Sequence, residues 1–127
     1  MNLLVKSILS ILFGFSIVFG SINLEVDAVS VNQKDRLIEK VSKDFTNKFC
    51  NGIGFGLSKE SAMNFAFNEN KQVYQNKKGI ENIENDLLSE AISTSVIEKC
   101  GYPLNLNGEK GTIQFKKDYL SMIDNLK

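Results

Sequence analysis

The chain of 127 residues contains only two cysteines, Cys50 and Cys100, and their positions constrain the fold more than any other feature. Each cysteine falls in the last turn of a segment whose apolar residues recur with helical spacing. A bond between them would hold the C-terminal ends of two helices together, so these helices would run roughly parallel. The bond would also close a loop of about fifty residues, which is worth roughly 4 kcal/mol in the chain-entropy model.

Whether these cysteines are oxidised depends on the compartment, and the first 28 residues indicate export. Lys6 precedes an apolar run that reaches Gly20, and a stretch ending at Ala28 follows, which is the order of a secretory signal peptide. We predict cleavage after Ala28, with Gly20 or Ser21 as the alternative positions. The competing interpretation is an uncleaved anchor over residues 8–24, although this run is shorter than the roughly 20 apolar residues of a spanning helix. No cysteine follows the run, which excludes a lipoprotein anchor.

An even pair of cysteines in an exported protein is most simply a structural disulfide. A redox pair is a weaker interpretation, because the spacing is not C-x-x-C. A metal site is weaker still, because the sequence has no histidine to complete it.

Residues 29–127 have the length of one small domain and contain four segments of helical periodicity. We predict helices over residues 35–49, 58–76, 80–100 and 112–126, with an earlier end of the second helix within the very polar residues 68–76 as the alternative. Asn32, Ser58 and Thr112 are candidate N-caps, and Asn51-Gly52 and Gly101 are the expected stops. No segment alternates as a strand would, so the predicted fold is all-α, a small four-helix domain with short connections. The residues expected to face inward are Leu37, Ile38, Val41, Phe45, Phe49, Leu57, Ala62, Met63, Ala66, Phe67, Val73, Tyr74, Ile80, Ile83, Leu87, Leu88, Ala91, Ile92, Val96, Ile97, Phe115, Tyr119, Met122, Ile123 and Leu126.

The composition argues against several classes of function. The mature part carries 14 basic and 13 acidic residues with no basic stripe, so neither nucleic-acid binding nor charge-driven binding to an anionic membrane is supported. Arg36 is the only arginine, which leaves one candidate for bidentate recognition of phosphates or carboxylates. The absence of histidine removes the commonest general base and metal ligand, and we expect no metal and no cofactor.

The triplet Gly52-x-Gly54-x-Gly56 invites comparison with a phosphate-binding loop. It follows a helix rather than a strand, its last spacing is one residue, and no Gly-Lys-Ser/Thr closes it, so nucleotide binding is disfavoured. We expect a tight helix–helix connection that needs a positive φ. Ile53 and Phe55 on this connection either pack inward or present an apolar surface to a partner.

Three further motifs have simpler structural interpretations. The acidic residues Glu81, Glu84, Asp86 and Glu90 lack any sign of a pocket that would desolvate them, so a solvated helix face is expected. No D-x-D-x-D-G calcium loop is present. The pair Ser58-Lys59 cannot act as a hydrolytic dyad, because neighbouring side chains on a helix point to different faces.

The turn Tyr102-Pro103-Leu104 follows Cys100 directly. An aromatic residue beside a disulfide and a proline more often packs over the bridge than forms a recognition turn. Tyr102 is nevertheless kept as a candidate for partner binding.

Two segments, residues 49–62 and 98–103, together resemble a group of small exported two-cysteine helical proteins of cyanobacteria. They read Phe-Cys-Asn-Gly-Ile-Gly-Phe-Gly-Leu-Ser-Lys-Glu-Ser-Ala and Glu-Lys-Cys-Gly-Tyr-Pro. The likeness covers about residues 35–125. It implies a periplasmic or thylakoid-lumenal location, and it brings no catalytic residues to carry over.

These observations favour an exported, non-enzymatic structural or interaction protein, an extrinsic component that docks on a membrane protein complex. The expected partner-binding residues are Ile53, Phe55 and Tyr102, with Cys50 and Cys100 structural. The alternative is a carrier of a small apolar ligand in a cavity between the helices. An enzyme is disfavoured, and membrane contact is expected only through an uncleaved leader.

Overall fold

The computed structural model describes the backbone of residues 22–126, and the side chains from Val31 onward. The chain divides between Val31 and Asn32 into two units, and the packing described below is that of the second. The predicted leader core and the cleavage positions at Gly20 and Ser21 lie outside the described residues. Among the described residues, no helix is long and apolar enough to cross a membrane.

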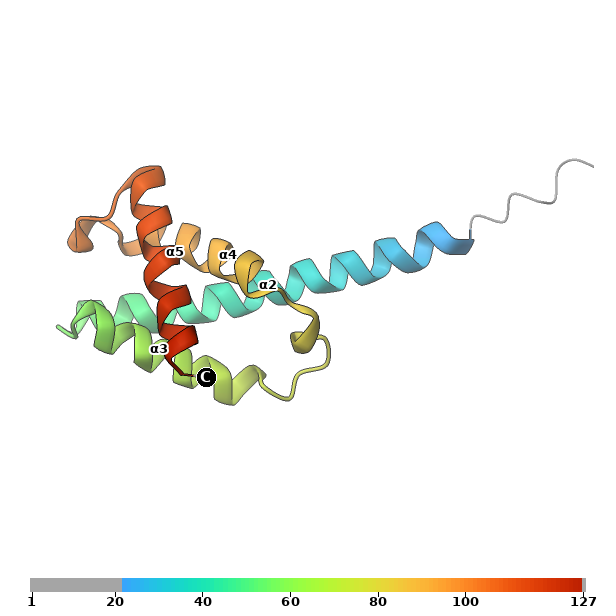
Figure 1. The fold of residues 1–127 in the computed structure, drawn as a ribbon, viewed down its shortest axis with the longest axis horizontal. Coiled ribbons are helices and arrows are strands. Elements are labelled where there is room, and N and C mark those ends of the chain that lie inside the picture. The colour runs from blue at the N-terminus through green and yellow to red at the C-terminus, as the bar shows by residue number, and fades with distance from the viewer. Residues whose placement is uncertain (1–21, 127) are drawn as a thin grey trace, which may run out of the picture. The chain divides into compact units, whose positions relative to one another are not determined.

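Four α-helices and two short 3₁₀ turns make up the described part of the chain, which contains no strand (Figure 1). The all-α prediction is therefore confirmed for residues 22–126. In chain order the elements are α2 (Ile22–Gly54), α3 (Lys59–Tyr74), η1 (Ile80–Asn82), α4 (Asn85–Cys100), η2 (Tyr102–Leu104) and α5 (Gly108–Asn125).

One predicted helix start is confirmed and two are wrong. Ser58 caps α3 as expected, and its hydroxyl oxygen accepts a hydrogen bond from the backbone N–H of Ser61 at 3.1 Å. Asn32 is not a cap, because α2 begins ten residues earlier, at Ile22. Thr112 is not a cap either, because α5 starts at Gly108, and the Thr112 hydroxyl donates to the Gly108 carbonyl within the first turn.

Two other boundaries also differ from the prediction. The first helix does not stop at Asn51-Gly52 but continues to Gly54. The third helix does not run unbroken from residue 80, because Ile83 adopts an extended conformation between η1 and α4.

All four α-helices contribute side chains to the core of the domain. Aromatic rings fill its centre: the Phe45 and Tyr119 centroids lie 5.3 Å apart and those of Phe49 and Phe115 lie 5.1 Å apart, both pairs edge to face. The buried cluster comprises Phe45, Phe49, Ala62, Met63, Ala66, Ile92, Val96, Phe115 and Tyr119. All nine were expected to face inward from their spacing.

Four residues predicted to face inward lie largely in solvent. Leu57, Val73, Leu87 and Leu126 expose between 43% and 57% of their surface. Leu57 and Leu126 lie just beyond the ends of α2 and α5, and Val73 and Leu87 lie in the last turn of α3 and the first turn of α4.

Polar contacts fix α3 against α2. The Asn70 amide, which is buried, donates to the Val41 carbonyl at 2.9 Å and accepts from the Lys48 ammonium at 3.0 Å. The buried Tyr74 hydroxyl donates to the Asp44 carboxylate, and burial followed by this contact raises the pKa of Tyr74 to about 12.

Candidate docking surface

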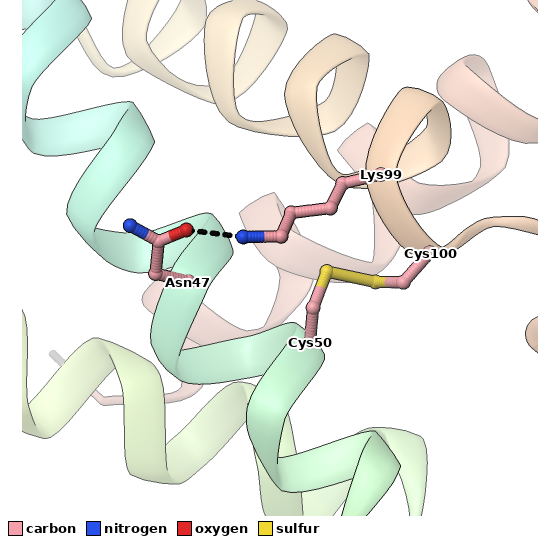
Figure 2. Close-up of a disulfide and its surroundings, with 4 residues drawn as sticks. All are labelled: Asn47, Cys50, Lys99 and Cys100. Carbon is pink, nitrogen blue, oxygen red and sulfur yellow. Dashed lines mark hydrogen bonds between the residues drawn. A yellow bond between two sulfur atoms is a disulfide. The ribbon is translucent and has the colours of Figure 1, made fainter.

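The disulfide between Cys50 and Cys100 is present, with the two Cα atoms 5.8 Å apart (Figure 2). It joins the C-terminal part of α2 to the last residue of α4, and the two helices run in the same general direction towards it, as predicted (Figure 1). Figure 2 shows that a hydrogen bond beside the bridge also connects α2 and α4: the Lys99 ammonium donates to the side-chain carbonyl of Asn47. A disulfide of this kind is typical of an oxidising compartment outside the cytoplasm.

Both cysteines lie near the C-terminal ends of their helices, and this position bears on their chemistry. The negative end of the helix dipole disfavours a thiolate, whereas catalytic cysteines are commonly found at helix N-termini or beside positive charges. The position of the bridge therefore suits a structural role better than a redox role.

The chain after Cys50 leaves α2 through a left-handed cap. The N–H of Leu57 donates to the Gly52 carbonyl at 3.0 Å, and the N–H of Gly56 donates to the Ile53 carbonyl at 3.0 Å. This pair of bonds is the Schellman motif, with Gly56 at φ +91° as its left-handed residue. The expected positive φ is thus confirmed at Gly56, and the cap holds Phe55 immediately before it.

The chain after Cys100 repeats the same motif one short turn later. The N–H of Leu106 donates to the Gly101 carbonyl at 2.9 Å, and that of Asn105, at φ +55°, donates to the Tyr102 carbonyl at 3.1 Å. A Cβ atom on Gly101 would lie only 2.2 Å from the Leu106 carbonyl oxygen, so this close approach requires glycine. Leu104 and Leu106 pack against the core and anchor the turn from within.

The two caps expose one aromatic ring each. Phe55 is 88% exposed and Tyr102 is 86% exposed, the two highest values among the large apolar side chains that the structure describes. Ile53 behaves differently, because it is half-buried and packs against the core. The expectation that Tyr102 packs over the bridge is wrong, because its side chain is 86% exposed, whereas Leu104 and Leu106 pack against the core.

The two chain segments that adjoin the bridge contain no charged residue. Residues 49–58 and 100–108 contain no Asp, Glu, Lys or Arg, although 24% of the chain is charged. Each run adjoins one cysteine of the bridge, and both lie on the left in Figure 1. We call the surface formed by residues 51–58 and 101–108 the uncharged end. The two long charge-free runs were visible in the sequence and could have predicted it.

Two acidic residues of α4, Asp86 and Glu90, lie elsewhere and contact the same lysine of α5. The Lys116 ammonium contacts the Glu90 carboxylate at 2.8 Å and the Asp86 carboxylate at 3.0 Å, and these contacts raise the pKa of Lys116. The carboxylates of Asp86 and Glu90 are exposed, as expected. They also form ion pairs with Lys116 of α5. Glu84 lies 3.7 Å from the Lys34 ammonium, and a Glu81 carboxylate oxygen accepts from the Gly79 N–H.

A groove of about 400 Å³ lies between the start of α3 and the end of α5. Met63, Met122 and Leu126 supply its apolar surface, and the Lys59 ammonium spans it to the Asp118 carboxylate at 2.6 Å. It is an open groove of mixed polarity, whereas the sequence suggested an apolar cavity between helices. Within residues 22–126, no three His, Cys, Asp or Glu side chains are grouped as a metal ion would require.

Comparisons of the chain with protein-family models, with curated proteins and with solved structures found no match. The function is therefore inferred from the geometry of the uncharged end itself.

Proposed function

We propose that this protein is an exported, non-enzymatic docking domain that binds a membrane protein complex as an extrinsic component, in the periplasm or the thylakoid lumen. The observation that supports this most is the pair of caps, which hold Phe55 and Tyr102 almost fully exposed on loops without charged residues. Soluble domains usually keep such aromatic side chains against their own core, and exposed ones commonly mark binding sites.

The caps favour tight binding because they reduce its entropic cost. Their backbone N–H groups are already bonded to helix carbonyls, so the loops need not become ordered when a partner arrives. Burial of a phenylalanine side chain contributes about 1.5–3 kcal/mol. In protein interfaces, a few large buried side chains contribute most of the binding free energy. Phe55 and Tyr102, together with the flanking Leu57, would have this role here.

The absence of charge indicates the chemistry of the partner surface. A charged partner would lose hydration against residues 51–58 and 101–108 without gaining an ion pair. An apolar pocket on the partner fits this end, and its binding should depend only weakly on salt concentration.

The test is affinity purification of the tagged full-length chain from its own membranes in mild detergent, under non-reducing conditions. We expect a stoichiometric membrane-protein partner with the wild type and with Val73→Ser, a matched control whose side chain is exposed on α3. The double variant Phe55→Ser/Tyr102→Ser should lose the partner while keeping its disulfide and its helical circular dichroism. Equal recovery by the double variant would exclude the uncharged end as the docking surface.

The groove between α3 and α5 supports a second candidate, carriage of a small ligand. Its volume lies within the range of small-molecule sites, and its methionines are adaptable apolar contacts. Native mass spectrometry of the purified chain tests this: a co-purifying mass that disappears in Leu126→Asp, a substitution at the exposed edge of the groove, would support it, and the bare protein mass alone would reject it.

A further inference from the structure

Two Asn-Gly pairs occur in the sequence, and the structure places them in opposite settings. Asn51-Gly52 lies inside α2, whereas Asn107-Gly108 joins the loop after η2 to the first residue of α5. Asparagine is chemically labile. It is most labile before glycine, which has no side chain to hinder attack by its own backbone nitrogen on the asparagine amide. The two settings therefore decide which pair can deamidate.

Asn107-Gly108 is open to this reaction. Both residues are exposed, and the Asn107 side chain makes no capping hydrogen bond to the start of α5. Gly108 is the first residue of that helix, and the first N–H groups of a helix have no partner within it. A Cβ atom on Gly108 would meet nothing within 4 Å, so no packed atom hinders movement on that side. Rotation of the peptide disturbs the bond from the Gly111 N–H to the Asn107 carbonyl at 3.2 Å, at the end of the helix, where fraying is common.

Asn51-Gly52 is held by the helix around it. Gly52 is buried, and a Cβ atom there would approach that of Ala62 to 3.2 Å. Its N–H lies within α2, where each amide bonds the carbonyl four residues earlier. The Gly52 carbonyl accepts from the Leu57 N–H at 3.0 Å, and the Asn51 carbonyl accepts from the Phe55 N–H at 2.9 Å. Attack requires the Gly52 nitrogen to turn towards the Asn51 side chain, and these bonds oppose that turn.

We propose that Asn107 is a site of spontaneous deamidation, and that the reaction places a negative charge on the uncharged end and weakens docking. The Gly108 backbone nitrogen attacks Cγ of Asn107, a carbon–nitrogen bond forms, and Nδ2 leaves as ammonia with the proton of the Gly108 N–H. Water then opens the resulting succinimide at one of its two carbonyl groups, which gives aspartate or isoaspartate. Water is the only reagent consumed, and no atom is oxidised or reduced.

The effect on docking rests on the proposed function. Residues 101–108 contain no charged side chain, and the exposed Tyr102 lies on the same segment as Asn107. A carboxylate at position 107 would lose hydration against an apolar pocket of the partner without gaining an ion pair. The next charged residues along the chain, Glu109 and Lys110, have opposite signs, so the product adds one net negative charge to this part of the chain.

The site is tested by incubating the purified full-length chain in mildly alkaline buffer and mapping its peptides by mass spectrometry. We expect aspartate and isoaspartate to accumulate at position 107 while Asn51 stays unchanged. In urea with the disulfide reduced, both pairs should convert at similar rates, because the fold no longer protects Asn51. No conversion at position 107, or equal conversion of both pairs in the folded chain, would overturn the proposal. Protection of Asn51 that persists in urea would overturn its structural explanation.

The effect on docking is tested with two variants of the same residue. Asn107→Asp carries the charge of the product from the start, and Asn107→Ser is the matched control, a helix-capping side chain without charge. In affinity purification from native membranes, we expect Asn107→Ser to recover the partner as the wild type does and Asn107→Asp to recover several-fold less. Equal recovery by both variants would overturn the effect on docking. A wild type that recovers no partner would reject the proposed function and with it this effect, whereas the peptide maps decide independently whether Asn107 deamidates.

Discussion

Gly56 and Gly54 flank Phe55 and offer a matched pair of substitutions that test how the uncharged end is built. Gly56 has φ +91° and is the left-handed residue of the α2 cap, whereas Gly54 is the last residue of the helix. A Cβ atom would meet nothing within 4 Å at either position, so a clash cannot account for any difference between them. Gly56→Ala and Gly54→Ala therefore isolate the backbone conformation.

The expected magnitudes have opposite signs. An L-residue in the left-handed region costs about 1–2 kcal/mol. Part of this is offset because alanine restricts the unfolded chain, which leaves Gly56→Ala destabilising by about 1 kcal/mol. Gly54→Ala removes a glycine from a helix and should stabilise the domain by about 0.5 kcal/mol at this terminal position. Since about 1 kcal/mol shifts the melting temperature of a domain of this size by roughly 4–8 °C, the two variants should differ by about 6–12 °C.

The measurement is thermal unfolding of both variants and the wild type by circular dichroism, with the disulfide intact in each. The order predicted is Gly54→Ala, wild type, Gly56→Ala, from most to least stable. Equal melting temperatures, or a more stable Gly56→Ala, would refute the left-handed cap and with it the rigid presentation of Phe55.

Three other perturbations follow from the structure. Replacing both Cys50 and Cys100 by serine opens a loop with a sequence separation of 50 and should cost about 4 kcal/mol in urea unfolding; a loss near zero would show that the caps alone hold the two helix ends. The raised pKa of Tyr74 means that the folded state holds the phenol proton more tightly, so stability present below pH 10 is lost as the pH rises towards 12. Tyr74→Phe should flatten this part of the pH profile, and an unchanged profile would contradict the assignment. Phe115→Ala should cost about 3–5 kcal/mol because the ring is fully buried, whereas Phe55→Ala should stay within about 0.5 kcal/mol, and similar losses would place Phe55 in the core.

The helical core could be predicted from sequence because its signal is regular. Phe45 and Phe49 on α2, and Phe115 and Tyr119 on α5, repeat every four residues, and burial of large rings decides such positions strongly. The disulfide was predictable for a similar reason, since two cysteines admit one intramolecular pairing.

The helix ends could not be predicted as well. A glycine is found both where a helix ends and where two helices approach each other closely, and the sequence does not distinguish the two cases. Gly52 is not the end of α2; it lies within the helix, where a Cβ atom would approach that of Ala62 to 3.2 Å, and the cap falls four residues later at Gly56. Likewise, the left-handed residue of the second cap is Asn105, which a glycine-based search overlooks.

The exposure of the candidate site residues depended on these same ends. The sequence left Ile53 and Phe55 equivalent, because both are apolar and both are flanked by glycine. The structure separates them: Ile53 packs against the core, and Phe55, as the residue before the left-handed glycine, points to solvent. Beyond Cys100, Leu104 and Leu106 pack against the core, and Tyr102 is exposed.

The measurement that tests the central claim most directly is site-specific photo-crosslinking of the full-length chain in its own membranes. A benzophenone side chain is placed at position 55, at position 102, or at position 73 on the exposed surface of α3. The docking account predicts one dominant, saturable crosslinked product from 55 and 102 and none from 73. Crosslinks from 73 alone, or equal and diffuse labelling from all three positions, would contradict the claim that the uncharged end is where this protein binds.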